Sequence, residues 1–329
     1  MRLGSFFRYK MPINFIILIC AISILINWIL NIKGIGDYDW DIDHSMYFGQ
    51  RLLEGEFIWT KEFNDRLLIE QILFALPASY TSVLVWFLLS TAFVIFGSWA
   101  CFVLVDDILS GSPSIPCKDR KLAAIISVVS MVYLFTFLPG GLYHVNPASA
   151  SLALVCLALL VRSLPDSSHI RWYPFFISAL SASISIGIRP YFFLALIFTA
   201  TLLIKNRTRT WIGENSAIFP LGTWIILVGI FCFLINMLPY IVIGDLNAFN
   251  AGISMLSQDI NPQSFIVTVQ RILIVFFNQN PFIILLTIVS TASVIYTLSI
   301  LIEFNIEKFK RKTLNDIIAL ILVLPIFLL

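Results

Sequence analysis

The sequence predicts an all-α polytopic membrane protein, and two observations support this fold class. Of the 329 residues, 59% are hydrophobic and only 12% are charged, and the mean hydropathy of +0.93 is far above that of a soluble globular domain. Apolar runs of about the length that crosses a bilayer alternate with short polar segments. The basic residues lie in short clusters without a continuous basic face, which excludes nucleic acid as a partner. The five cysteines form no CxxC pair, so neither a disulfide framework nor a zinc site is implied.

The apolar runs predict about nine transmembrane helices in a single domain, residues 1–329. The first run, 13–32, follows three basic residues and lacks a small-residue cleavage site, so we expect an uncleaved signal anchor with a cytoplasmic N-terminus. The other predicted spans are 81–105, 122–138, 148–161, 174–188, 191–204, 218–243, 281–302 and 314–329.

The apolar run 264–278 is ambiguous, because it is short and holds Arg271 at its centre. Counting it as a span would place the basic cluster 308–312 outside, against the positive-inside rule. We therefore predict that 245–279 is a second external segment with interfacial helices. This topology leaves fifteen of the 21 lysines and arginines on the cytoplasmic side and gathers the acidic residues outside.

The first external loop, 33–80, begins with an acidic stretch. Four aspartates alternate there with Tyr38, Trp40 and Ile42: Asp37, Asp39, Asp41 and Asp43. In an extended strand this alternation would point all four carboxylates to one side. Such crowding favours a proton acceptor or a bound cation.

A helical pattern follows the acidic stretch. One stripe contains Ile42, Met46, Gly49 and Leu53, while Asp43 is suited to cap the N-terminus and Gly55 to end the helix. A second amphipathic stretch, 67–78, is expected to rest on the outer surface of the membrane.

Two segments of this loop carry a family resemblance. They read Asp-Trp-Asp-Ile-Asp-His-Ser-Met-Tyr-Phe-Gly-Gln-Arg-Leu-Leu-Glu-Gly over 39–55 and Trp-Thr-Lys-Glu-Phe-Asn-Asp-Arg-Leu-Leu over 59–68. The pattern resembles the first external loop of the GT-C membrane glycosyltransferases, the superfamily of the protein O-mannosyltransferases and the lipid A aminoarabinose transferase. In that family the loop reads approximately Asp-Glu, three or so residues, Tyr, and Leu-Leu-x-Gly, followed by an Asp/Lys-Pro-Pro-Leu stretch.

The match selects two candidates for the catalytic acid of the family. Asp41 has the family's distance to the Leu-Leu-Glu-Gly segment, whereas Asp43 has the family's distance to Tyr47. The sequence departs from the pattern at Ile42, where the family has Glu, and at 67–68, where leucines replace two prolines. Relatives usually continue past the length of this chain, so we expect a fragment or a reduced member.

The resemblance implies an inverting glycosyltransferase at the external face of a membrane. The donor would be a polyprenyl-phosphate-linked sugar and the acceptor an unidentified glycan, lipid or protein. Asp41 or Asp43 would take a proton from the acceptor as a general base. A merely acidic external loop is the alternative. No cofactor is required, and a divalent cation at the aspartates stays an option although no complete ligand spacing is visible.

Arg189 is the best-placed cation for the phosphate of the donor. It lies between the runs 174–188 and 191–204, and a helix of about 15 residues rises only about 22 Å against about 30 Å of hydrocarbon. The turn should therefore be recessed in the outer leaflet, where a guanidinium either binds phosphate or snorkels to the interface. Arg66 and Arg271 are weaker phosphate candidates with an interfacial role as the alternative.

Four further residues are candidates for contact with the substrate. His144 and Asn146 lie in an external turn, where they would contact a sugar or serve as turn and cap residues. Trp40 and Tyr47 would stack on a sugar or belong to an interfacial aromatic belt.

Two other function classes compete with the enzyme. One is a transporter or flippase of lipid-linked sugars, for which we expect paired broken helices and polar residues at mid-membrane, whereas no apolar run here holds an acid at its centre. The other is a non-catalytic degenerate relative. For all three we expect a protein of the bacterial inner (plasma) membrane, in contact with its lipids.

Overall fold

A computed structural model describes residues 40–60, 67–110, 116–137, 145–165, 169–190, 192–208 and 217–259, together with positions 18 and 22. The described part is all-α and contains no strand. Its helices are α2 (Trp40–Leu53), α3 (Leu68–Ser79), α4 (Val83–Ser110), α5 (Cys117–Phe137), α6 (Asn146–Ser163), α7 (Trp172–Ile188), α8 (Phe192–Thr208), α9 (Ile218–Cys232), the π-helical turn η4 (Phe233–Met237), α10 (Leu238–Ile243) and α11 (Leu246–Asp259). The predicted spans 281–302 and 314–329 lie outside the described residues, and so does 13–32 apart from two positions.

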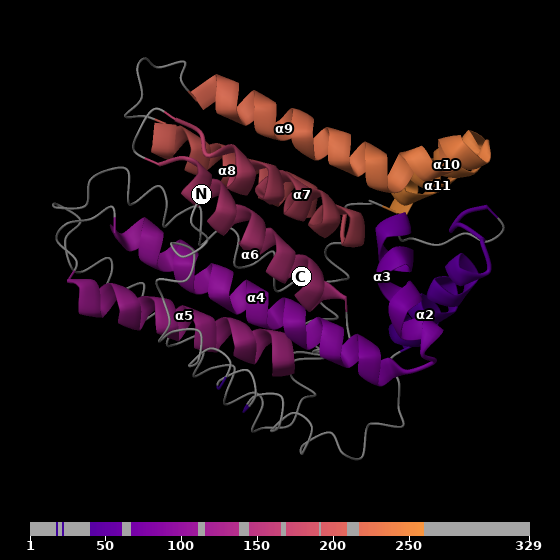
Figure 1. The fold of residues 1–329 in the computed structure, drawn as a ribbon, viewed down its shortest axis with the longest axis horizontal. Helices are drawn as coiled ribbons and strands as arrows, with labels where there is room; N and C mark the ends of the chain where they lie inside the picture. Colours follow the sequence, from indigo (N-terminus) through magenta and orange to yellow (C-terminus); the bar gives the residue numbers. More distant parts are fainter. Residues whose placement is uncertain are drawn as a thin grey trace.

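Helices α4 to α9 form a bundle in which successive helices run in opposite directions (Figure 1). α6 lies between α4 and α7, α5 packs on α4, and α9 packs on α7. The short helices α2, α3, α10 and α11 gather at one end of this bundle (Figure 1).

Three helices of the described part are long and apolar enough to cross a membrane: Val83–Ser110, Asn146–Ser163 and the continuous stretch Ile218–Ile243. They coincide with the predicted spans 81–105, 148–161 and 218–243. α7 and α8 are helices of 17 residues each separated at Arg189–Pro190, so the predicted break between two short apolar helices is confirmed. The described part of the chain is therefore all-helical, and its three long apolar helices indicate a membrane protein.

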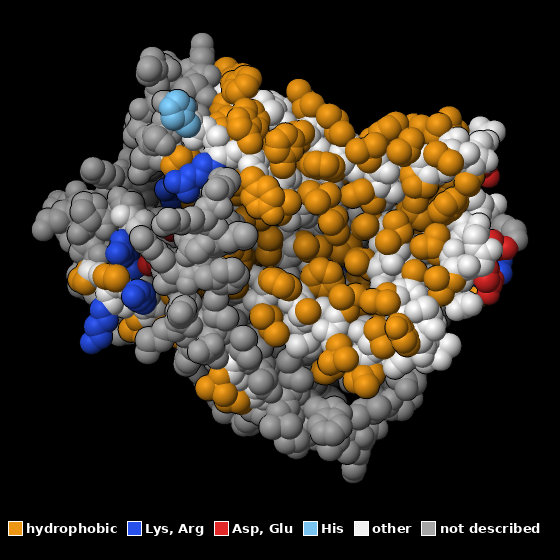
Figure 2. Space-filling view, in the orientation of Figure 1, with side chains coloured by type: hydrophobic (Ala, Val, Ile, Leu, Met, Phe, Trp, Pro, Cys, Tyr) orange, Lys and Arg blue, Asp and Glu red, His pale blue; other side chains and the backbone are white. Residues whose placement is uncertain are grey.

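Charges separate to the two ends of the bundle, with hydrophobic side chains between them (Figure 2). One end, called the basic end, carries the termini of α5 to α8 with Lys118, Arg120, Lys121, Arg162, Arg171, Lys205 and Arg207. The other end, called the acidic end, carries α2, α3 and the start of α11 with Asp43, Glu54, Glu56, Glu70 and Asp245. An apolar band flanked by polar ends is the surface that a bilayer requires.

Small and hydroxyl-bearing residues bring the central helices close together. Ser149 and Ser185 each donate from Oγ to the backbone carbonyl of the other, both at 2.9 Å. A Cβ added at Gly97 of α4 would lie 2.5 Å from Ser151 Oγ on α6. Small residues that allow close backbone approach, and hydroxyls that bond across helices, are the usual means of packing helices in lipid.

An ion pair ties three helix C-termini together at the basic end. Arg162 Nε on α6 lies 3.3 Å from Asp107 Oδ2 on α4, and Arg207 Nη2 on α8 donates to the Asp107 carbonyl at 3.1 Å. The Arg162 guanidinium also lies over the Trp99 ring at 5.6 Å. Cations at helix C-termini interact favourably with the helix dipole. The contacts of Arg162 and Arg207 with Asp107 therefore hold the C-terminal ends of α4, α6 and α8 together.

Candidate functional site

Segments from distant parts of the sequence meet around one apolar cluster at the acidic end. The cluster contains Ile42 of α2, Ile69 of α3, Val145 just before α6 and Ile188 of α7, together with Phe74, Trp86 and Ala148. Three of these residues are sequence neighbours of predicted site residues: Asp41 and Asp43 flank Ile42, Asn146 follows Val145, and Arg189 follows Ile188. Segments almost 150 positions apart in sequence therefore contribute to a single core.

Arg189 is a buried cation at the end of α7. Its side chain and backbone together are 3% exposed, and its backbone N–H donates to the Ser185 carbonyl at 3.0 Å. Its Nε donates to Asn146 Oδ1 at 2.5 Å, which links the C-terminus of α7 to the first residue of α6. A buried guanidinium requires compensating partners because removing it from water is costly. Arg189 is thus enclosed by protein, which argues against the alternative that it snorkels to the lipid interface.

Helix α2 begins earlier than the sequence pattern indicates. The prediction of an acidic strand up to Asp43 is wrong for its second half, because the helix starts at Trp40, while Asp37 and Asp39 lie outside the described residues. Two residues apart in an α-helix are turned by about 200°, so positions 41 and 43 lie on different faces. Asp43 itself is exposed.

The end of α2 follows the prediction. Gly55 adopts a φ of +84°, its N–H donates to the Leu52 carbonyl at 3.0 Å, and the Glu56 N–H donates to the Arg51 carbonyl at 2.9 Å. This pair of bonds around a left-handed glycine is a Schellman motif. It turns the chain back toward α3.

Tyr47 lies on the outer side of α2 and is 43% exposed. The Arg51 guanidinium lies over its ring at 5.9 Å, and the Phe48 ring meets it edge-on at 5.3 Å. His44 packs edge-on against the same Phe48 ring at 4.7 Å. The ring of Tyr47 therefore has an intramolecular stacking partner on one side.

Helix α3 covers 68–79, so the predicted amphipathic stretch 67–78 is a helix, and it packs one face on the protein. Phe74 is fully buried and stacks on Trp86 of α4, with the ring centroids 4.1 Å apart. A Cβ added at Gly49 of α2 would collide with the Phe74 carbonyl, and one at Gly187 of α7 would collide with Ile69. These glycines allow α2 and α7 to approach the backbone and first turn of α3 closely. Ile72 and Leu76 on the other face are exposed, and the expected position of this helix on the outer membrane surface stays a prediction.

Two polar residues of α3 are buried against α2. Ser45 Oγ donates to Glu70 Oε1 at 2.8 Å, and Glu70 is 2% exposed. Gln71 Nε2 donates to the Phe48 carbonyl at 2.9 Å. The polar face of an apparently amphipathic helix thus points into the protein.

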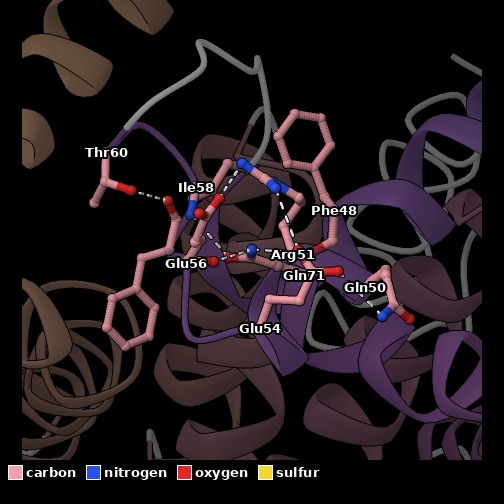
Figure 3. A network of polar contacts seen from close by, with 9 residues as sticks. Phe48, Gln50, Arg51, Glu54, Glu56, Ile58, Thr60 and Gln71 are labelled. Atoms are coloured by element: carbon pink, nitrogen blue, oxygen red, sulfur yellow. Dashed lines mark hydrogen bonds and ion pairs between the residues drawn. The ribbon is translucent and has the colours of Figure 1, made fainter.

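Gln71 also organises the loop that follows α2 (Figure 3). Its Nε2 donates to the Glu56 carbonyl at 2.8 Å, and its Oε1 accepts from the Ile58 N–H at 2.9 Å. On the outer side of the loop Arg51 pairs with Glu54 at 3.2 Å and with Glu56. Loss of hydration lowers the pKa of Arg51, but the Glu56 carboxylate and other neighbours raise it by a larger amount. The net pKa of Arg51 therefore lies above its ordinary value.

A buried amide connects the span Ile218–Ile243 to α3. Asn236 lies in the π-helical turn η4 and is 6% exposed. Its Nδ2 donates to the Cys232 carbonyl at 3.2 Å, and its Oδ1 accepts a long bond of 3.4 Å from the Ile69 N–H. Since the N-cap residue Leu67 has no side-chain acceptor, Asn236 serves an otherwise unsatisfied N–H of the first turn of α3.

An aromatic contact joins the two predicted external segments. Tyr240 Oη donates to the Ile58 carbonyl at 2.5 Å, and the Trp59 ring stacks on Tyr240 at 6.0 Å and lies close to Phe249 of α11. Trp59 has a φ of 71°, a left-handed conformation that is unfavourable for a bulky residue. Interfacial helices were predicted within 245–279, and the described part of this segment does contain a helix, α11; its position at the interface stays a prediction.

Several predicted site residues lie beyond what the structure describes. Arg66, His144 and Arg271 fall outside the described residues, and so do the side chains of Trp40 and Asp41. Within the described ranges no group of three or more His, Cys, Asp or Glu side chains is arranged to hold a metal ion.

The sequence reasoning did not select Ser45, Glu70, Gln71 or Asn236. Asn236 carried a usable signal, because a lone amide within an apolar run of spanning length marks a functional or structural contact. Glu70 and Gln71 carried only a weak one, since polar residues on an amphipathic helix normally face water.

No protein-family model matches the chain, and searches of curated proteins and of solved structures likewise find no significant match.

Proposed function

We propose that this protein is a GT-C-like inverting glycosyltransferase that moves a sugar from a polyprenyl phosphate to an acceptor at the external face of the membrane. The observation that carries the proposal is the convergence of α2, which bears Asp41 and Asp43, with the buried Arg189 around one core at the acidic end. Transfer from a lipid-linked donor needs a base for the acceptor proton and a cation for the leaving phosphate, both at the membrane boundary. The type of reaction is inferred from the resemblance of the loop 39–68 to the GT-C enzymes.

Asp41 is the general base in this proposal. Position 41 lies one helical turn before Ser45 and on the same face of the helix backbone, which is the face that α3 covers. Position 43 lies on a different face, and Asp43 is exposed. The register therefore supports Asp41 over Asp43, in agreement with the Leu-Leu-Glu-Gly spacing.

Arg189 stabilises the departing phosphate. The acceptor hydroxyl or amine gives its proton to Asp41, while the oxygen or nitrogen of the acceptor forms a bond to the anomeric carbon of the donor sugar. The bond between that carbon and the phosphate oxygen breaks, and its electron pair stays on the polyprenyl phosphate. A guanidinium held by Asn146 is preorganised for the growing charge. Arg66 and Arg271 are proposed as further phosphate contacts, and Trp40, Tyr47, His144 and Asn146 as substrate contacts.

The basic end faces the cytoplasm and the acidic end the outside in this proposal. Clusters of lysine and arginine at membrane-helix ends mark the cytoplasmic side. We propose the bacterial inner membrane as the location, where lipid-linked sugars replace nucleotide sugars at an external site.

A flippase of lipid-linked sugars is the second candidate, and one observation favours it. The span Ile218–Ile243 contains the π-helical turn η4 with the buried Asn236. Such turns are frequent at functional sites, and irregular helices with polar residues at depth are typical of transporters.

One experiment separates these readings. Purified protein is incubated with labelled polyprenyl-phosphate sugars and candidate acceptors, and release of polyprenyl phosphate is measured for the wild type and for Asp41→Asn. The enzyme predicts release that the substitution abolishes. Movement of the donor across vesicle membranes without release would favour the flippase. If neither release nor movement is seen, the result would favour a degenerate relative.

A further inference from the structure

Glu70 is a buried carboxylate at the acidic end that the proposed reaction does not use. The described residues include three buried charged side chains, Glu70, Asp106 and Arg189, and Glu70 is the acid among them that lies at the proposed site. Burying a carboxylate is costly unless hydrogen bonds compensate. Its position in the first turn of α3, where the helix dipole favours negative charge, reduces that cost.

The Glu70 carboxylate contacts α2 at a specific point. Ser45 Oγ donates to Oε1 at 2.8 Å, and both residues are buried. Ser45 is four positions after Asp41, so the bond is made one helical turn from the proposed base and on the same face of the helix backbone. The second polar contact between the helices, from Gln71 to the Phe48 carbonyl, lies farther along α2, away from position 41.

The surrounding contacts fix α3 itself. Its first turn meets Gly187 of α7 through Ile69, and its Ile69 N–H is bonded by Asn236 of η4. These contacts hold the first turn of α3 against α7 and η4. Apolar contacts act on the distance between α2 and α3, whereas a directional hydrogen bond such as that from Ser45 to Glu70 also constrains the rotation of α2.

We propose that Glu70 is a positioning residue for the base: through Ser45 it fixes the rotation of α2 and thereby the place of the backbone that carries Asp41. This inference rests on the proposed glycosyltransferase function. Its physical basis is that a small misplacement of a catalytic group lowers the rate of the chemical step without weakening the binding of a substrate held elsewhere.

The test compares Ser45→Ala and Glu70→Gln with matched controls. Ser79→Ala removes a hydroxyl of α3 that bonds only within its own helix, and Glu54→Gln neutralises an exposed carboxylate of the same loop. Single-turnover transfer, KM for the labelled donor and the thermal unfolding temperature are measured for each variant. We expect Ser45→Ala to lower the transfer rate by roughly tenfold or more, with the donor KM as in the controls. Its unfolding temperature should fall below that of the controls, because the buried Glu70 carboxylate loses a hydrogen-bond donor, so transfer is measured well below that temperature. Glu70→Gln keeps an acceptor oxygen for Ser45 and should retain most of the rate.

Two results would overturn the proposal. One is a transfer rate of Ser45→Ala equal to that of Ser79→Ala. The other is loss of transfer in Glu70→Gln while Ser45→Ala is unaffected, which would mean that the charge of Glu70 is itself used.

A second measurement does not depend on activity. A thiol introduced by Asp41→Cys is titrated from outside with an impermeant reagent, with and without Ser45→Ala. We expect the rate of modification to change severalfold. If the wild type transfers no sugar but this change is seen, the glycosyltransferase proposal fails and the positioning contact stands. If the rate is unchanged, the positioning contact fails whatever the activity.

Discussion

Two positions along a helix separate Asp41 from Asp43, and that spacing places them on opposite faces of α2. We predict that Asp41→Asn lowers single-turnover transfer by roughly a hundredfold or more, the loss expected for a general base. Asp43→Asn, at an exposed position, should keep the rate within about threefold, since surface changes perturb little. Expression and donor binding should be normal for both. Equal losses in the two variants would refute this assignment.

Arg189 yields a prediction about donor affinity. Arg189→Ala removes the cation proposed for the phosphate and should raise the donor KM by roughly tenfold or more, as expected for a charge-assisted contact. Arg189→Lys keeps the charge but loses the planar fork and should be intermediate. The donor KM and the unfolding temperature are measured together. The control is Arg51→Ala, which removes another arginine of the acidic end, one that pairs with Glu54 and Glu56.

A different outcome would reassign Arg189. If Arg189→Ala lowers the unfolding temperature and leaves the donor KM unchanged, the guanidinium serves only to join α6 and α7. Loss of a buried partner lowers stability in either case, so the KM is the deciding quantity.

The sequence selected Arg189 and Asn146 because each lies in a turn between two apolar runs. The contact between them joins positions 43 apart in sequence, and no local pattern reports such a pairing. The same holds for Asn236 and Ile69, which are 167 apart. Local sequence thus finds residues at breaks between helices but not their partners.

At the scale of elements, the loop after α2 depends on one side chain of α3. Gln71→Leu should lower the free energy of unfolding by about 3 kcal/mol. The substitution removes the three hydrogen bonds of the Gln71 amide to backbone groups of α2 and the loop, and each contributes about 1 kcal/mol. Thermal unfolding measures the loss, and limited proteolysis should detect cleavage near residues 54–60 first. Gln50→Leu is the matched control, since its single bond to Glu54 is exposed. Equal effects of the two changes would contradict the role given to Gln71.

A second prediction for an element concerns the contact between α11 and the first loop. Gly252→Ala would place a methyl group within the Trp59 ring, so we expect α11 to be displaced and the unfolding temperature to fall. Quenching of tryptophan fluorescence should increase as Trp59 gains contact with water. Gly229→Ala on α9 has open space around it and should be neutral or stabilising, since alanine favours a helix.

Hydrophobic runs and breakers predicted most helices, including α3, but they placed the start of α2 too late. The alternation of aspartates suggested a strand up to Asp43, yet the helix begins at Trp40, because the packing of Ile42 against α3 and α4 overrides a short local pattern. For α3 the sequence pattern predicted the helix but not which face is buried. Glu70 and Gln71 face the protein, where α2 and the following loop supply their partners.

At the scale of the molecule, burial differs sharply among the apolar helices. In α6, 78% of the apolar window is buried inside the described structure, against 17% in Ile218–Ile243. Apolar length alone does not separate these two, because both are long and apolar enough to cross a membrane. The small residues of α6 distinguish it, as helices surrounded by other helices in a membrane need close backbone approach.

The orientation of the whole molecule gives the last prediction. Cys117 is exposed at the basic end, whereas Glu54 is exposed at the acidic end. In intact cells an impermeant thiol reagent should modify a thiol introduced by Glu54→Cys, but it should reach Cys117 only after permeabilisation. We expect this orientation because moving clustered lysines and arginines across the membrane is costly. Cys117→Ser provides the control for the natural thiol. Labelling of Cys117 from outside would show that the topology is the inverse of the one proposed. The acidic end would then face the cytoplasm, where nucleotide sugars are available, and the argument for a lipid-linked donor would lose its physical basis.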